Sequence, residues 1–344
     1  MPGQDEIPYS PEAAFAAVSA LFGARAKAME PLSQHGTFGV GGLADVWVSV
    51  ATEEELAQLV ALAWERRYPL LLVGNGTNTL YADAGARGIV ARMAIEHVQL
   101  QPRDEAHAVL RVGAGASLPA LVKKLAPLGW AGLEWAAGVP GTVGGAIVSN
   151  AGAHAACVAD TVLSTRTLLA PGAPDGAPSQ TQARELSGED LALGYRTSRF
   201  RSGRLVTFDD EGRPHAPARA LIEPAEIIVE ATFLLKRDDP ASIAARAKSY
   251  LDHRKRTQPP QKSAGSVFKN PEPQKSGRLI EEAGLKPYRI GGAEISARHA
   301  NFIINTGGAT AADVAALMAL ARRTVRERFG VELELEVEPR GDWR

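Results

Sequence analysis

Two glycine-rich stretches are the parts of this sequence best suited to binding a phosphate-bearing ligand. The second glycine stretch, residues 138–152, holds five glycines and no charged residue. The first glycine loop, residues 73–78, follows the apolar run at residues 69–73. Glycine lets the backbone approach a ligand and adopt positive φ, so that clustered N–H groups can face phosphate oxygens. Both stretches are therefore candidates for the diphosphate of a long cofactor, although tight turns in a small-residue core remain an alternative.

Three polar residues elsewhere could act on a ligand held there. Arg196 lies in the run GYRTSRF, where a surface arginine is the alternative interpretation. Ser266 lies among small residues without a GxSxG motif or a neighbouring histidine, which argues against hydrolase chemistry. Glu336 belongs to residues 331–338, where apolar and acidic residues alternate. This two-residue period predicts a final strand, whose acidic face could equally be a solvated edge.

A run of basic residues, 253–256, closes a helix expected at residues 242–256. Cations at a helix C-terminus gain about 0.3–1 kcal/mol each from the helix dipole, which is one explanation of the run. Recognition of a phosphorylated ligand is the other.

The first glycine loop needs a strand and a helix to position it. Residues 45–50 are apolar and β-branched and predict a strand. Thr52 and Glu55 form a capping-box pattern for a helix that continues to about residue 66. The order strand, helix, strand, glycine loop fits a βαβ unit that meets a phosphate. Because the spacing is not GxGxxG, we do not assign a Rossmann domain.

The remaining pattern indicates a second sheet and a C-terminal α+β region. Further strands are expected at residues 88–91, 109–112, 162–169, 226–235 and 302–304, with helices at 117–125, 279–283 and 310–329. Ser117 is a candidate cap for the first of these helices, and residues 171–182 predict an exposed loop. We have no functional explanation for an additional excursion at residues 205–224.

Composition limits the function classes. The chain has 344 residues, with 38 Lys and Arg against 39 Asp and Glu, for a formal net charge of −1. That balance argues against nonspecific binding to nucleic acid or an anionic membrane. No run approaches the ~20 apolar residues of a membrane span. The lone Cys157 and the absence of zinc-ligand spacing argue against disulfides and a metal site, so a cytoplasmic protein is expected, with no obligate protein partner evident.

The motifs together resemble the UDP-N-acetylenolpyruvoylglucosamine reductase family, whose flavoenzymes complete UDP-N-acetylmuramate for the bacterial cell wall. The resemblance extends from about residue 37 to residue 337. It rests on residues 74–78, 138–152, 194–200, 264–271, 299–302 and 335–337. Between residues 234 and 242 the chain lacks a tyrosine-bearing insertion found in one branch, so it resembles the shorter branch.

This resemblance implies an α+β fold of the vanillyl-alcohol-oxidase type, with two FAD-binding subdomains and a C-terminal α+β substrate-binding domain. The implied division is a tail and helix at residues 1–34, subdomains at 35–95 and 96–238, and the substrate domain at 239–344. Noncovalent FAD and the hydride donor NADPH are implied as well. The implied FAD-binding residues are Gly74, Asn75, Gly76, Thr77, Asn78, Gly138, Val139, Pro140, Gly141, Thr142, Gly144, Gly145, Asn150 and Gly152.

Residue roles follow from the same resemblance. Arg196 and Glu336 would activate and position the enolpyruvyl carboxylate, and Ser266 would donate the proton. The UDP-sugar ligands would be Arg256, Lys269 and Asn270. Hydride addition at C3 of the enolpyruvyl group places negative charge on C2 and the carboxylate, so a cationic arginine favours the transition state.

Two other functions remain open from the sequence. A flavin oxidase of the same fold would use oxygen as its acceptor. A noncatalytic flavin- or nucleotide-binding module would hold flavin without oxidising NADPH when the enolpyruvyl substrate is added. One assay of NADPH oxidation separates all three.

Overall fold

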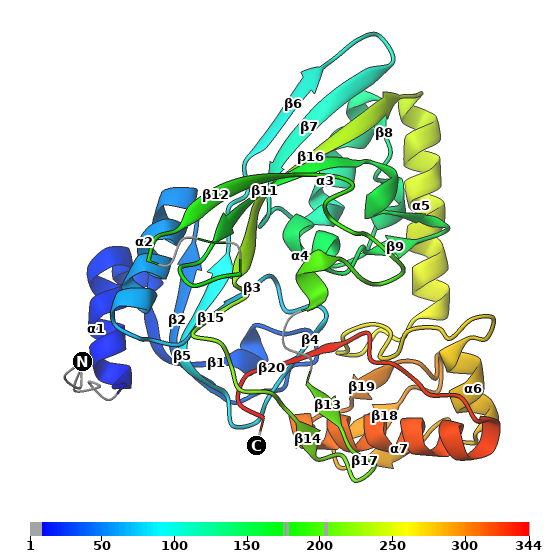
Figure 1. Cartoon of the computed structure of the whole chain (residues 1–344). Helices are drawn as coiled ribbons and strands as arrows, with labels where there is room; N and C mark the ends of the chain where they lie inside the picture. The colour runs from blue at the N-terminus through cyan, green and yellow to red at the C-terminus, as the bar shows by residue number, and fades with distance from the viewer. Residues whose placement is uncertain (1–8, 175, 177–178, 203–205, 344) are drawn as a thin grey trace.

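A computed structural model describes residues 9–174, 176, 179–202 and 206–343. The first eight residues of the expected tail, part of the expected loop at 171–182, and Leu205 at the start of the excursion lie outside the described residues. The fold is α+β. Two sheets form its upper part, and a helix-rich C-terminal part lies below them in the view of Figure 1.

The first sheet carries the first glycine loop. Its strand order is β1 (Lys27–Pro31), β2 (Leu43–Val50), β5 (Ala86–Met93), β3 (Leu70–Val73) and β15 (Ile222–Glu223). Helix α2 (Glu53–Glu65) connects β2 to β3, and both strands run parallel to β5 between them. The expected strand–helix–strand order before the first glycine loop is confirmed.

Helix α2 begins as expected, after the Thr52 cap. The Thr52 hydroxyl accepts the Glu55 N–H at 3.2 Å. The Glu55 carboxylate accepts the Ala51 N–H at 2.8 Å. Helix α1 (Pro11–Phe22) packs with α2 against the face of the sheet that carries Val46 and Val48.

The second sheet is antiparallel. Its order is β12 (Gln182–Ser187), β11 (Val162–Leu169), β16 (Glu226–Arg237), β7 (His107–Gly113) and β6 (Val98–Pro102), with β8 (Trp130–Ala131) paired to the end of β16. The strands expected at residues 109–112, 162–169 and 226–235 are confirmed, whereas β6, β8 and β12 were not predicted. Helix α3 (Leu118–Leu125) is confirmed too, but the Ser117 hydroxyl at its N-cap accepts no capping hydrogen bond.

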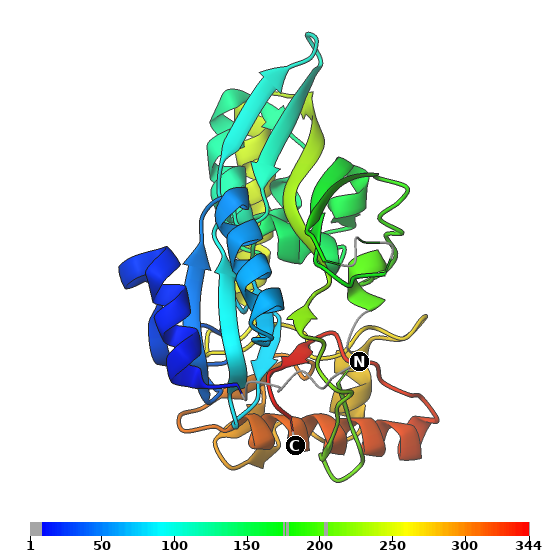
Figure 2. The ribbon, with the colours of Figure 1, turned by 60° about the vertical axis from the view of Figure 1, so that its left-hand side comes forward.

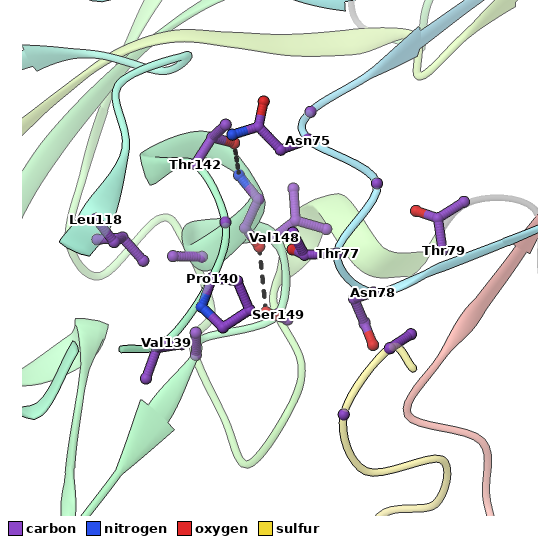
Figure 3. Close-up of a pocket in the computed structure, with 18 of the residues that line it drawn as sticks. Asn75, Thr77, Asn78, Thr79, Leu118, Val139, Pro140, Thr142, Val148 and Ser149 are labelled. Atoms are coloured by element: carbon purple, nitrogen blue, oxygen red, sulfur yellow. Dashed lines mark hydrogen bonds between the residues drawn. The ribbon is translucent and has the colours of Figure 1, made fainter. Parts of the chain in front are cut away.

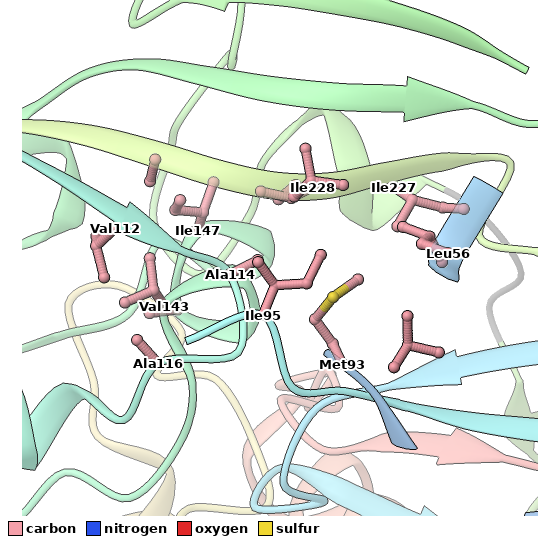
Figure 4. Close-up of a cluster of buried hydrophobic side chains, with 14 of the residues drawn as sticks. Leu56, Met93, Ile95, Val112, Ala114, Ala116, Val143, Ile147, Ile227 and Ile228 are labelled. Atoms are coloured by element: carbon pink, nitrogen blue, oxygen red, sulfur yellow. The ribbon is translucent and has the colours of Figure 1, made fainter. Parts of the chain in front are cut away.

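One apolar core joins the two sheets and fixes the second glycine stretch. Figure 4 shows Met93, at the end of β5, and Ile95, just after that strand, near Ile227 and Ile228 of β16. Helix α4 (Val143–Val148), which forms inside the second glycine stretch, adds Val143 and Ile147 to the same cluster. The glycine-rich backbone is therefore held by buried side chains on one side while its other side faces a cavity.

The C-terminal part begins with α5 (Pro240–Thr257), which runs from the second sheet toward the lower part of the molecule (Figure 1). Below it, β17 (Arg289–Ile290), β18 (Ala293–Ile295) and β19 (Ile303–Asn305) form a small antiparallel sheet. Helices α6 (Ser276–Glu282) and α7 (Ala311–Phe329) pack beside it. Helix α7 begins at the capping box of Thr310 and Asp313 and ends at Gly330, as the sequence predicts.

The excursion before β15 packs on this part of the molecule. Strands β13 (Thr207–Phe208) and β14 (Pro214–His215) form a short hairpin. Arg322 and Arg323 of α7 donate hydrogen bonds to the carbonyls of Phe208 and Asp210, at 2.7 and 2.6 Å. Figure 2 shows this hairpin beside α7.

The expected strand at residues 331–338 is wrong. Only Leu335 makes an isolated bridge, to Phe268, and the last strand is β20 (Glu338–Arg340), paired in parallel with β4 (Thr79–Tyr81). Residues 331–338 are bridged first to Phe268, and the chain then pairs with β4, so these residues form no continuous ladder of hydrogen bonds with one strand. Leu333 is buried between the exposed Glu332 and Glu334, as the alternation predicts, but Val337 lies between Glu336 and Glu338, which are themselves partly buried.

Within the described residues, every helix is too short or too polar to cross a membrane. The same residues contain no group of three or more His, Cys, Asp or Glu side chains that could hold a metal ion.

Candidate active site

A cavity of about 820 Å³ lies where the two sheets meet the C-terminal part. It is lined by the first glycine loop, the second glycine stretch, the end of α5 and residues 263–266. Figure 3 shows the first glycine loop facing the second glycine stretch across this space, with Asn75, Thr77 and Asn78 opposite Val139, Pro140 and Thr142. Every FAD-binding residue implied by the sequence lines it except Asn150.

Glycine allows the two stretches to approach each other closely. A Cβ atom on Gly74 would lie 2.9 Å from the Thr142 hydroxyl, and one on Gly141 would lie 3.2 Å from the Thr77 hydroxyl. Gly76 has φ +61°, and a Cβ there would overlap the carbonyl oxygen of His35. Gly74 and Gly76 require glycine for space, and Gly76 and Gly141, with φ +138°, require it for their backbone conformation.

Free backbone donors line this narrow region. Among the described residues, the N–H groups of residues 74–78 and of Gly141 donate no hydrogen bond. Clustered, unpaired N–H groups form concavities that bind anions. The geometry therefore fits the diphosphate of a dinucleotide.

Asn150 has a structural position next to the site. Its Nδ2 donates to the Gly194 carbonyl at 2.9 Å, and its Oδ1 accepts the Ala159 N–H at 3.1 Å. The side chain thus ties the second glycine stretch to the segment that carries Arg196.

Arg196 and Glu336 meet in the cavity. The Arg196 Nε atom lies 2.8 Å from Glu336 Oε1, and its Nη2 donates to the Gly152 carbonyl at 2.9 Å. Arg196 has φ +54°, which is unfavourable for a residue with a side chain. Burial raises the pKa of Glu336, although Arg196 and Arg201 act in the opposite direction. The site thus contains an ion pair whose two side chains are only 22% and 18% exposed.

Ser266 lines the same cavity. The next residue, Val267, accepts the Glu336 N–H at 2.7 Å and donates its own N–H to the Asn301 carbonyl at 2.8 Å. The Asn301 side chain forms two more bonds to the main chain of Phe268, at 3.0 and 2.8 Å. Ser266 and Glu336 therefore sit on neighbouring backbone segments, and the structure brings together the three residues to which the resemblance gives catalytic roles.

The three implied UDP-sugar ligands do not line the cavity. Arg256 is exposed on α5. Lys269 forms an ion pair with Glu334 at 3.1 Å. The Asn270 main-chain N–H donates to the hydroxyl of Tyr195, the neighbour of Arg196, at 3.2 Å.

The end of α5 instead directs other side chains inward. The lining residues there are Leu251, Arg254, Lys255 and Gln258, at the i, i+3, i+4, i+7 spacing of one helix face. The Arg254 guanidinium makes no hydrogen bond or ion pair with a described residue, and burial lowers its pKa. An anionic ligand in the cavity would pair with this guanidinium and balance its charge. Sequence analysis missed Arg254, although the helical period could have identified it within the basic run.

Comparisons with known proteins agree with this geometry. The family model described as "UDP-N-acetylenolpyruvoylglucosamine reductase, C-terminal domain" matches residues 258–339, and an "FAD binding domain" model matches residues 44–173. The chain is 42% identical over 308 residues to the UDP-N-acetylenolpyruvoylglucosamine reductase of Chloroflexus aurantiacus, covering 90% of this chain and 95% of that protein. It is 39% identical over 309 residues to the enzyme of that name from a Synechococcus species, covering 89% and 91%.

A solved structure is similar over the same length. The UDP-N-acetylenolpyruvylglucosamine reductase of Thermus caldophilus superposes with a TM-score of 0.68 at 35% identity, covering 91% of this chain and 97% of that one. The fold is therefore α+β, with a vanillyl-alcohol-oxidase-type FAD-binding fold followed by a C-terminal α+β domain.

Proposed function

Because this chain belongs to the UDP-N-acetylenolpyruvoylglucosamine reductase family, we propose that it reduces UDP-N-acetylglucosamine enolpyruvate to UDP-N-acetylmuramate, using NADPH and noncovalently bound FAD. The reaction supplies peptidoglycan synthesis, and through it cell shape and division. One observation carries the proposal: a single cavity joins the anion-binding glycine backbone to Arg196, Ser266 and Glu336.

The described residues fit FAD. The unpaired N–H groups of residues 74–78 and Gly141 would hold the diphosphate, and the apolar walls of the second glycine stretch would contact the flavin end. When bound, FAD takes a hydride from NADPH and supplies it to C3 of the enolpyruvyl group.

Arg196 would stabilise the charge that develops. Hydride addition leaves negative charge on C2 and on the attached carboxylate, and a guanidinium beside them lowers the transition state more than the ground state. Glu336 would fix the orientation of the Arg196 guanidinium through the 2.8 Å contact between Glu336 Oε1 and Arg196 Nε. Ser266 would then transfer its hydroxyl proton to C2, and the resulting alkoxide would regain a proton from solvent.

The substrate diphosphate needs cations near the cavity. Arg254 and Lys255 are supported by their position in the cavity wall, and Arg254 also by its lack of a partner among described residues. Lys269 and Asn270 remain candidates because Tyr195 links Asn270 to the Arg196 segment. The exposed Arg256 has less support.

NADPH oxidation by the purified protein tests the function. We expect oxidation to be stimulated by UDP-N-acetylglucosamine enolpyruvate, with one UDP-N-acetylmuramate formed per NADPH. Oxygen consumption in place of that product would indicate a flavin oxidase. Bound flavin with no stimulation by the substrate would indicate a noncatalytic module.

FAD should be released when the protein is precipitated with acid. The first glycine loop contains no His, Cys or Tyr that could form a covalent flavin bond, and His154 and Cys157 are the nearest such residues around the second glycine stretch. Flavin absorbance is expected in the supernatant. Yellow colour that stays with the washed pellet would contradict noncovalent binding.

Gly76→Ala should yield protein with little or no bound flavin. A left-handed φ costs a residue with a Cβ about 1–2 kcal/mol, and here the new atom would also overlap the His35 carbonyl, so the first glycine loop must move. Since each 1.4 kcal/mol is tenfold in affinity, FAD affinity measured by fluorescence titration should fall at least about tenfold.

Gly330→Ala is the matched control. Gly330 has a similar φ of +67°, but a Cβ there meets nothing within 4 Å, and the residue ends α7 away from the cavity. It should lose stability from the backbone conformation alone and keep its flavin. Equal loss of FAD in the two variants would refute a specific role of the first glycine loop.

A further inference from the structure

We propose that Arg201 is a positioning residue that holds the main chain of Arg196 and Glu336 together, so that their side chains meet in the cavity. Its Nη1 donates to the Arg196 carbonyl at 3.2 Å, and its Nη2 donates to the Glu336 carbonyl. The inference rests on the proposed function, because it concerns the same reaction.

The chemistry of this contact requires arginine. The Arg201 side chain is 8% exposed, and its planar fork reaches two carbonyls on segments that are far apart in the sequence. The third nitrogen, Nε, lies 3.7 Å from Glu338 Oε1. A lysine carries the same charge on a single nitrogen and cannot form this planar arrangement.

Glu338 and its partners hold Arg201 in turn. Burial opposes ionisation of Glu338, yet Arg340 and Arg201 keep its pKa below the usual range. Arg340 also pairs with Glu223, so its guanidinium is balanced by two carboxylates. Glu338 therefore contacts Arg201 at Nε, while the two terminal nitrogens bind the Arg196 and Glu336 carbonyls.

The backbone of Arg196 explains why such an anchor is needed. Its φ of +54° is unfavourable for a residue with a side chain and persists only when the surroundings hold it. Asn150 holds Gly194 on one side of Arg196, and Arg201 holds the Arg196 carbonyl itself. Gly194 and Thr197 close the turn around Arg196 by hydrogen bonds of 3.1 and 3.3 Å. Without Arg201, this turn keeps its own bonds but loses the link from the Arg196 carbonyl to the Glu336 carbonyl, so the two side chains can move apart.

Arg201 also acts on Glu336 by its charge. The cations around Glu336 are Arg196, Arg201 and Lys269, and the nearest acids along its own segment are Glu334 and Glu338. Burial raises the pKa of Glu336 and these cations oppose that shift. Removing the Arg201 charge would raise this pKa further, so the ionised form of Glu336 would appear at higher pH.

Two variants of Arg201 separate geometry from charge. Arg201→Lys keeps the charge, whereas Arg201→Met loses both the charge and the paired hydrogen bonds. For each, calorimetry would give the affinity of the oxidised holoprotein for UDP-N-acetylglucosamine enolpyruvate across pH. Stopped-flow absorbance would give flavin reduction by NADPH and reoxidation by that substrate separately.

In both variants we expect reoxidation to slow on the order of 10–100-fold, because small displacements of catalytic groups cost this much. Substrate affinity should fall as well, while flavin reduction should stay within about twofold of wild type. The pH midpoint of substrate binding should move upward in Arg201→Met and much less in Arg201→Lys.

Arg219→Lys is the matched control. Arg219 is 10% exposed and lies in the same charge cluster, where it pairs with Glu223 and Asp342 and does not line the cavity. It should lower the melting temperature while preserving reoxidation and substrate affinity. If it reduces them as much as the Arg201 variants do, Arg201 has only a structural role and the inference fails.

The inference also fails if both Arg201 variants bind substrate and reoxidise like wild type. That result leaves the proposed function intact, provided that the wild-type protein turns over. A wild-type protein that does not act on the enolpyruvyl substrate would instead overturn the proposed function.

Discussion

Ser266→Ala is expected to divide the reaction into its two halves, leaving flavin reduction by NADPH nearly unchanged and slowing reoxidation by the enolpyruvyl substrate ~10²–10⁴-fold, the typical effect of a lost general acid. The proton is needed only after hydride has reached the substrate. Within the described part of the cavity wall, the carboxylates are those of Glu226, Glu336 and Glu338, and each forms an ion pair with an arginine. Stopped-flow mixing with NADPH, followed by the substrate, measures both halves.

Ser266→Cys is the companion variant. A thiol is a stronger acid than a serine hydroxyl and keeps a proton at the same position, so reoxidation should be faster than in Ser266→Ala. If Ser266→Ala slows flavin reduction by NADPH but leaves reoxidation by the substrate normal, Ser266 is not the proton donor. Ser266 would then serve NADPH binding or flavin placement, and the proton would come from Glu336 or water.

Arg196→Lys is expected to reduce turnover on the order of 10²–10³-fold, the usual cost of removing one donor from a developing anion. The guanidinium contacts the Gly152 carbonyl and Glu336 from different nitrogens, which leaves its plane fixed for a carboxylate. A lysine ammonium is a compact charge and cannot make both contacts while facing the substrate. Steady-state assays of NADPH oxidation would measure the loss.

Arg166→Lys is the control for the general effect of this substitution. Arg166 pairs with Glu53 at 2.9 Å on the surface of the second sheet and does not line the cavity. It should retain wild-type turnover. Near-normal turnover of Arg196→Lys would remove Arg196 from the catalytic site.

Much of the local structure could be predicted because its causes are local. The strand Val162–Leu169 follows from its apolar and β-branched residues, and α7 follows from the Thr310 capping box and the Gly330 stop. The glycine stretches were identifiable since the need for close approach selects glycine at those positions.

Tertiary pairing was not available from the same patterns. Alternation at residues 331–338 identified Leu333 and Val337 as buried, but the segment changes partners between Phe268 and β4, and Glu336 and Glu338 are partly buried as well. The bonds from Arg201 to the Arg196 and Glu336 carbonyls depend on how separate segments meet, which no local spacing encodes. Arg254 is different, because the phase of α5 was present in the sequence and distinguishes it from the exposed Arg256.

The pairing of β20 with β4 has a consequence for the order in which the site is made. The first glycine loop leads directly into β4, and Asn78 at its end donates to the Glu336 carbonyl, 258 residues further along the chain. At ~5–20 residues per second, a ribosome takes about 10 to 50 s to synthesise the partner segment after the loop itself. During that interval the loop lacks the strand that fixes its exit. The complete cofactor site, with β20 paired to β4, can therefore form only late in synthesis, after the C-terminal segment has left the ribosome.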